Sequence, residues 1–200
     1  MSTEQISAAD VKKLRERTSA GMMDCKKALV EARGDMELAQ DILRKKGLSR
    51  VARRSNRVAE EGIVESYIHP GNKIGVLIEI NCETDFVART DDFKKLAKDL
   101  AMQVAATNPM AVDRESIDER TIGKEREIYK AQALESGKPE KIVEKIVDGR
   151  MNKFFQEVCL IEQAFVKDTD KTVTDVVNEV SAKTGEKIVI RRFVRYQLGE

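Results

Sequence analysis

The sequence predicts an α+β protein: an N-terminal helical domain is followed by a mixed core with a small antiparallel sheet and a projecting helical hairpin. Apolar residues recur at helical spacing over the first fifty residues and again after residue 90, whereas the run from Ile74 to Cys82 alternates as a strand does. The chain has 200 residues, of which 41% are hydrophobic and 36% charged, with no Trp. This composition is sufficient for a core and indicates a large solvated surface.

The first fifty residues predict three short helices. A Ser-x-x-Asp box that starts at Ser7 begins the first helix, and Gly21 separates it from the second. We expect Gly34 to end the second helix in a left-handed cap, Asp35 to cap the third, and Gly47 to end it. The apolar stripe of the second helix consists of Cys25, Ala28, Leu29 and Ala32.

Two adjacent methionines, Met22 and Met23, lie at the turn between the first two helices. Two large neighbouring side chains cannot both point into one small core, so at least one of them is expected to be exposed. The pair then either belongs to a loosely packed turn or forms an adaptable docking surface, for which flexible thioethers are suited.

A basic segment follows the helical domain. Residues 44–57 read RKKGLSRVARRSNR, with seven basic residues and no acid. They join a helical domain predicted at residues 1–50 to a core domain predicted at residues 58–200. The segment is interpreted as a solvated neck, as a contact for an acidic protein, or as the RNA contact of an adaptor. Because no aromatic residue is interleaved to stack on a base, no specific nucleic-acid partner is expected.

The core begins with a predicted hairpin of strands at residues 62–69 and 74–82, joined by the turn at residues 70–73. A long helix should start at Thr90 or Asp91 and end before Asn108-Pro109, where it can cover the apolar face of the hairpin. Residues 160–166 are expected to form a third strand. A second capping box begins a helix at Thr172, and residues 188–198 predict the last strand.

Residues 113–158 predict the helical hairpin, with its turn at Gly137-Lys138-Pro139. The outgoing helix is strongly charged and has few apolar positions, so the tip of the hairpin should project into solvent. The hairpin is either a scaffold or a docking arm.

The residue inventory excludes most enzyme classes. His69 is the only histidine, and three cysteines lie far apart without a CxxC pair, which excludes zinc clusters and mechanisms that need two histidines. A hydrolase would need Cys82 beside His69, yet these residues fall at opposite ends of the predicted hairpin. No catalytic residue, metal or cofactor is expected. With neither a signal peptide nor a membrane span, we expect a cytoplasmic protein without a membrane partner.

The segment from Cys82 to Thr90, CETDFVART, is unusual because it places an aromatic residue beside an acid in a loop. Asp85 is interpreted either as a turn or cap residue, with Phe86 plugging the end of the core, or as the neighbour of a protruding Phe86 wedge that disturbs a cation or hydrogen-bond network in a partner. Spacing alone does not choose between the two.

Two strings, VKKLRERTSAGMMDCKK at residues 11–27 and EINCETDFVAR at residues 79–89, resemble the elongation factor Ts family. The resemblance runs nearly end to end. It implies a guanine-nucleotide exchange factor for elongation factor Tu, with a UBA-like N-terminal domain and a coiled-coil hairpin. It also implies that Thr84, Asp85, Phe86 and Val87 enter the GTPase domain of elongation factor Tu, displace its magnesium ion and loosen GDP.

The resemblance implies further contacts and an assembly. Met22 and Met23 would dock on a helix of the same GTPase domain, and His69 would also contact elongation factor Tu, in its GDP-bound and nucleotide-free forms. The chain resembles short family members with one core module, so a homodimer that forms a 2:2 complex is expected. No disulfide between the subunits is expected from the three cysteines.

Overall fold

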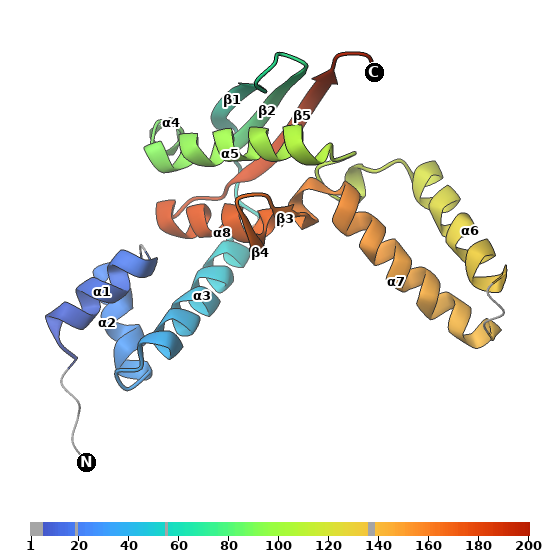
Figure 1. Ribbon diagram of the computed structural model, residues 1–200. Helices are drawn as coiled ribbons and strands as arrows, with labels where there is room; N and C mark the ends of the chain where they lie inside the picture. The colour runs from blue at the N-terminus through green and yellow to red at the C-terminus, as the bar shows by residue number, and fades with distance from the viewer. Residues whose placement is uncertain (1–5, 19, 55, 136–138) are drawn as a thin grey trace.

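The computed structural model describes residues 6–18, 20–54, 56–135 and 139–200, with the backbone alone for residues 48–53, 140 and 141. Its described part contains helices and small antiparallel sheets, which confirms the predicted α+β class. Figure 1 shows three parts: a group of N-terminal helices, a body in which helices pack on a sheet, and an arm of two antiparallel helices.

The N-terminal helices, here called the head, are α1 (Ala8–Thr18), α2 (Met22–Glu31) and the first half of α3 (Met36–Arg53). The predicted caps are present: Ser7 Oγ accepts a hydrogen bond from the Asp10 amide at 3.1 Å, and Asp35 Oδ1 accepts two amides at 2.9 Å. Gly34 adopts a left-handed conformation, with φ of 88°. The predicted stripe of α2 is buried and packs with Val11, Leu14, Ala39 and Leu43.

The third helix was expected to end at Gly47, but it continues to Arg53. A Cβ atom at Gly47 would lie 3.6 Å from the Cβ of Ala182, because α3 packs closely against α8 (Val173–Thr184) at this point. Gly47 therefore lies inside α3, at van der Waals distance from α8, and does not stop the helix.

Part of the basic segment is attached to the body rather than solvated. Arg54 donates to the carbonyl of Ser181 at 3.0 Å, and Arg44 lies 3.5 Å from Asp175. The side chains of residues 48–53 lie outside the described part of the chain. The division into domains at residues 1–50 and 58–200 remains a prediction.

The body is built on the sheet of β1 (Glu61–Ile68), β2 (Ile74–Cys82) and β5 (Val189–Gln197), in the order β1-β2-β5 with antiparallel pairing. Both strands of the predicted hairpin and the last strand are thus confirmed. Helix α5 (Asp91–Thr107) packs on the inner face of the sheet (Figure 1). Thr90 caps this helix, and Asn108 ends it with φ of 45°.

The predicted strand at residues 160–166 is largely wrong. Residues Leu160–Glu162 form a 3-10 turn, and only β3 (Ala164–Phe165) is extended, paired with β4 (Asp168–Thr172) in a separate two-stranded sheet. The apolar run was misleading because Leu160 is fully buried and its amide bonds to the carbonyl of Ala111. The polar sequence of β4 gave no strand signal. The box at Thr172 is confirmed as a complete capping box of α8.

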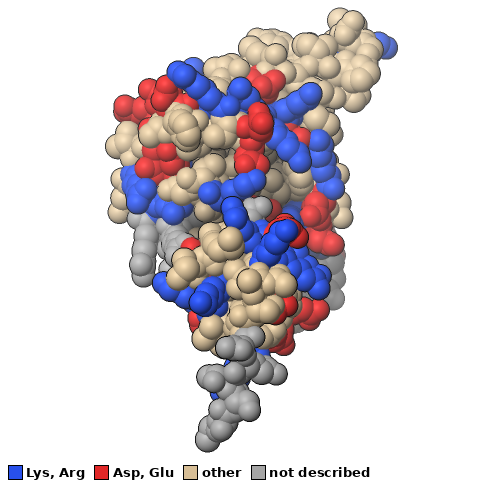
Figure 2. Space-filling model, turned by 90° about the vertical axis from the view of Figure 1, so that its left-hand side faces the viewer, with Lys and Arg blue, Asp and Glu red and all other residues tan. Residues whose placement is uncertain are grey.

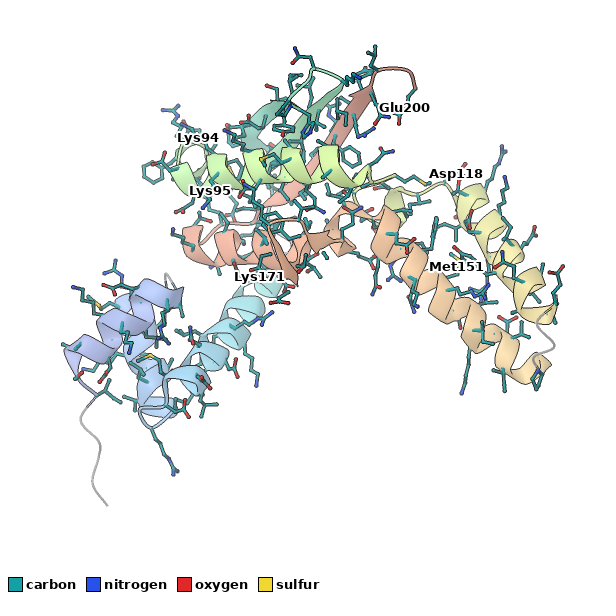
Figure 3. The ribbon with its side chains drawn as sticks, viewed as in Figure 1. Lys94, Lys95, Asp118, Met151, Lys171 and Glu200 are labelled. Atoms are coloured by element: carbon teal, nitrogen blue, oxygen red, sulfur yellow. The ribbon has the colours of Figure 1, made fainter. Side chains whose placement is uncertain are left out.

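The arm consists of α6 (Glu119–Glu135) and α7 (Glu140–Val158), as predicted. Met151 is buried on the side of α7 that faces α6 (Figure 3). Arg126 joins the two helices through Glu144 and Asp148, at 3.2 and 3.0 Å. The arm projects from the body, as expected, and Leu134 and Ile142 near its end are exposed (Figure 1). Residues 137 and 138 of the predicted turn lie outside the described residues.

Candidate functional site

The segment that links β2 to α5 forms a single-turn helix, α4 (Asp85–Ala88). Thr84 is its N-cap, and the Thr84 hydroxyl accepts a hydrogen bond from the Val87 amide at 3.4 Å. Val87 and Ala88 are buried in the core of the body, whereas Phe86 is 77% exposed. The interpretation of Phe86 as a core plug is therefore wrong, because its neighbours Val87 and Ala88 occupy that place and direct the ring outward. Residues 84–87 are called the tip below.

Asp85 neighbours the exposed ring. Its carboxylate pairs with Arg89 at 2.7 Å, one helical turn further along the chain, and both side chains are largely exposed. Asp85 is therefore not the cap, which is Thr84. Phe86, Asp85 and Arg89 thus place an aromatic ring, a carboxylate and a guanidinium near one another at the surface.

Two glutamates that the sequence analysis did not single out hold the tip in place. Glu186, in the loop between α8 and β5, accepts hydrogen bonds from the Thr84 amide at 3.0 Å and the Thr84 hydroxyl at 2.7 Å. Glu83 accepts from the Lys187 amide at 2.6 Å and from Arg57 at 3.2 Å. Only an indirect sequence signal pointed to these two residues. The loop after β2 meets the loop before β5 because the end of β2 pairs with the start of β5.

The environment of Glu83 favours its charged form. Burial alone would raise the pKa of Glu83, but the Lys187 amide and the Arg57 guanidinium stabilise the carboxylate and lower the pKa below its usual value. Arg57 belongs to the segment that leads from α3 to β1, so this carboxylate also connects the tip to the end of the basic segment.

Met22 and Met23 are 52% and 64% exposed, so both members of the pair lie at the surface. Val30 of α2 and Leu38 of α3 are also exposed. The head and α4 lie on the same side of the molecule, to the left of the arm in Figure 1. Figure 2 views that side and shows basic and acidic side chains interspersed, rather than one broad basic field.

His69 lies away from the tip. Strand pairing places Cys82 opposite Glu61, whereas His69 follows Ile68 at the other end of the hairpin. The Nδ1 atom of His69 lies 3.0 Å from the Tyr67 hydroxyl. The sequence argument against a Cys-His pair is thereby confirmed.

The three cysteines lie inside the protein. Cys25, Cys82 and Cys159 are free and fully buried. Burial and the nearby Glu186 carboxylate raise the pKa of Cys82 to about 11, so its thiol is protonated at neutral pH. A buried, protonated thiol at the opposite end of the hairpin from His69 does not support a Cys82 hydrolase. Among the residues that the structure describes, no cluster of three or more His, Cys, Asp or Glu side chains is arranged to hold a metal ion.

A family model described as Elongation factor TS matches residues 3–200 of the chain. The chain belongs to the elongation factor Ts family. It is 65% identical to elongation factor Ts of Moorella thermoacetica over 195 residues, which cover 98% of this chain and 96% of the relative. For elongation factor Ts of Desulforamulus reducens the identity is 63%, over 98% of this chain and 90% of the relative.

Family membership confirms the resemblance seen in the sequence and identifies the chain as a translation elongation factor by family. In this family member, the tip combines an exposed aromatic ring with a firmly held backbone. In the described part of the chain, each helix is too short or too polar to cross a membrane.

Proposed function

We propose that this protein binds elongation factor Tu with GDP, displaces the magnesium ion and promotes the exchange of GDP for GTP. The observation that carries the proposal is the exposed Phe86 ring on a braced tip, in a chain of the elongation factor Ts family. The protein acts by binding and breaks no covalent bond, so it is not an enzyme in the usual sense. Its place is in the cytoplasm, with the translation machinery.

Exchange requires that the factor bind the nucleotide-free GTPase more tightly than the GDP-bound form. The coupling is reciprocal, so GTP that enters the site weakens the hold of the factor in return. A ten-thousandfold shift needs about 5.5 kcal/mol of difference between the two states. Burial of one Phe supplies roughly 1.5 to 3 kcal/mol. Phe86 therefore acts together with the loss of the metal ion and with contacts elsewhere.

The tip is suited to disturb a magnesium site. A bound cation is among the largest local charges in a nucleotide site, so a small displacement of its ligands removes much of the stabilisation of the diphosphate. Phe86 would act as the wedge, with Asp85 beside it to compete for cations or hydrogen bonds. Thr84 and Val87 set the direction of the ring, because one caps α4 and the other is buried.

The head supplies affinity rather than exchange in this proposal. Met22 and Met23 dock on a helix of the GTPase domain, where flexible thioethers adapt to the surface of the partner. His69 makes a separate contact with elongation factor Tu at the far end of the hairpin. Since the head and the tip lie on one side of the molecule (Figure 1), a single partner can contact both.

We further propose that the protein is a homodimer that binds two molecules of elongation factor Tu in a 2:2 complex. The outer face of the main sheet is exposed and apolar, and it also carries the Glu79–Arg192 ion pair at 2.6 Å. Two copies related by a two-fold axis can pack these faces together and place the acid of one copy near the base of the other. The exposed apolar residues of this face are Val64, Ile68, Leu77, Val194 and Tyr196.

Sedimentation equilibrium tests the dimer. Leu77→Glu should convert a dimer into a monomer, because it buries a charge at the centre of the face. The matched control is Val166→Glu, at an exposed apolar position away from the sheet. A monomeric native chain, or a dimer that Leu77→Glu leaves intact, would refute this assembly.

Immobilising the chain and passing a bacterial lysate over it without nucleotide tests the function itself. One GTPase, elongation factor Tu, should be retained and then eluted by GDP. The native chain should also accelerate the release of a fluorescent GDP analogue from purified elongation factor Tu. Failure to retain elongation factor Tu, or release at the spontaneous rate, would refute the proposal.

A further inference from the structure

We infer that Glu186 is a positioning residue for nucleotide exchange, which holds the tip at the angle from which Phe86 reaches the partner. This inference rests on the proposed exchange function and assigns a role to a residue in a different loop, 100 positions along the chain from Phe86.

The Glu186 carboxylate takes three hydrogen bonds from the residues that precede α4. Its Oε2 atom accepts from the amides of Glu83 and Thr84, both at 3.0 Å, and its Oε1 atom accepts from the Thr84 hydroxyl at 2.7 Å. Hydrogen bonds to a charged carboxylate are stronger than bonds between neutral groups. A single carboxylate thus fixes two consecutive peptide units and one side chain.

The clamp is reciprocal. Glu83 accepts from the amide of Lys187 at 2.6 Å, so each of the two glutamates binds the backbone of the opposite loop. The Glu83 carboxylate also receives the Arg57 side chain, and Lys187 Nζ donates to the Arg57 carbonyl at 3.0 Å. The loop before the tip and the loop before β5 are therefore tied together on both sides.

The clamp controls the direction of Phe86 through Thr84. The Thr84 hydroxyl donates a hydrogen bond to Glu186, which leaves its oxygen lone pairs free to accept from the Val87 amide. This second bond is the N-cap of α4. A helix of four residues cannot form on its own, since helix nucleation is unfavourable. Its orientation must come from this cap and from the buried Val87 and Ala88.

The test uses the full chain with Glu186→Ala and the milder Glu186→Gln, which can keep part of the hydrogen bonding. The matched control is Glu179→Ala, an acid of α8 that pairs with Lys171 and contacts neither loop. The release of a fluorescent GDP analogue from elongation factor Tu is followed over a range of factor concentrations. Circular dichroism and thermal melting check the fold of each variant.

We expect Glu186→Ala to lower the maximal release rate about tenfold, through lost charge-assisted bonds, with Glu186→Gln in between. The factor concentration at half-maximal rate should stay near the native value, since the head is unchanged. In a Phe86→Ala background, Glu186→Ala should have little further effect, because it acts through that ring. Hydrogen exchange of the Glu83 and Thr84 amides should be faster in Glu186→Ala.

Suppose that the native chain is active and that Phe86→Ala slows release. An unchanged maximal rate in both Glu186 variants would then overturn this inference and leave the exchange function standing. An equal loss in the Phe86→Ala background would overturn it as well, because the residue would then act through general stability. A native chain that fails to accelerate release would overturn the exchange function, and this inference with it.

Discussion

The tip and the start of α2, where Met22 and Met23 lie, both present apolar side chains at the first turn of a helix, yet they are built in different ways. Phe86 stands on a helix whose N-cap Thr84 makes a side-chain hydrogen bond and is itself bound by Glu186. Met22 and Met23 begin α2 after Gly21, whose missing side chain provides no such cap. The first surface is fixed by bonds from a distant loop, whereas the second is held by the packing of its own helix.

Under the proposed function, this difference supports separate roles for the tip in exchange and for the head in docking. A wedge must hold its direction against the surface that it displaces, and a preorganised backbone provides that resistance. A docking surface gains more from flexible side chains that adapt to the partner. The following experiments separate the two roles, in order of decreasing expected effect.

Phe86→Ala should have the largest effect. It removes the wedge and should lower the maximal rate of GDP release more than tenfold, since burial of one Phe contributes roughly 1.5 to 3 kcal/mol. The fold should be unchanged, because the ring is exposed. Stopped-flow fluorescence measures the rate. Val166→Ala, at another exposed apolar position, is the control; equal rates for the two variants would remove the distinction between tip and surface.

Paired replacement of Met22 and Met23 by Ser should come next. We expect the concentration of factor at half-maximal exchange to rise roughly tenfold, because two partly buried thioethers are lost at the interface. The maximal rate should stay within about twofold of the native value. Titration of the factor in the same assay gives both parameters. A lower maximal rate with unchanged half-saturation would assign the head to exchange instead of docking.

The packing of α3 on α8 places the head relative to the tip, and Gly47 tests it. Gly47→Leu should destabilise the protein by about 1 to 3 kcal/mol, since Ala182 occupies the space that the new side chain needs. Gly47→Ala should fit, because the contact of 3.6 Å is ordinary. Gly123→Leu is the control in an open part of α6, where thermal denaturation should show no loss. A stable Gly47→Leu protein would mean that α3 packs elsewhere.

The smallest effect concerns pH. The pKa of Glu83 is lower in the folded protein than its unfolded value of about 4.3, so its stabilising contribution is present above that pH. This contribution is lost as the pH falls through the folded pKa. Glu83→Gln should therefore be less stable than the native chain by about 1 kcal/mol or less at pH 7, with a smaller difference at pH 3. Urea denaturation at both values checks the sign, which a constant difference would contradict.

Much of the fold follows from local patterns. The alternation from Ile74 to Cys82, the stripe of α5 and the boxes at Ser7 and Thr172 each act within a few residues, so the sequence carries them directly. The errors come from long-range packing. Gly47 was expected to stop α3 but lies inside the helix, where it passes α8. The run after Cys159 was expected to be a strand, but its amides bond to residues 111 and 112.

The candidate site divides in the same way. The composition of the tip identified it as unusual, but its direction was undecided because the burial of Val87 and Ala88 depends on the sheet and on α5. Glu186 was missed for a related reason. Its partners are more than 100 residues away in the chain and meet it only through the pairing of β2 with β5.

The most direct test of the account compares the two surfaces in one assay. The release of a fluorescent GDP analogue from elongation factor Tu is measured against the concentration of the native chain, of Phe86→Ala and of the double variant at Met22 and Met23. The account predicts a lowered plateau at native half-saturation for the first variant, and a native plateau at raised half-saturation for the second. If both variants change the same parameter, the tip and the head have the same role. The central claim, that a fixed wedge acts beside an adaptable docking surface, is then contradicted.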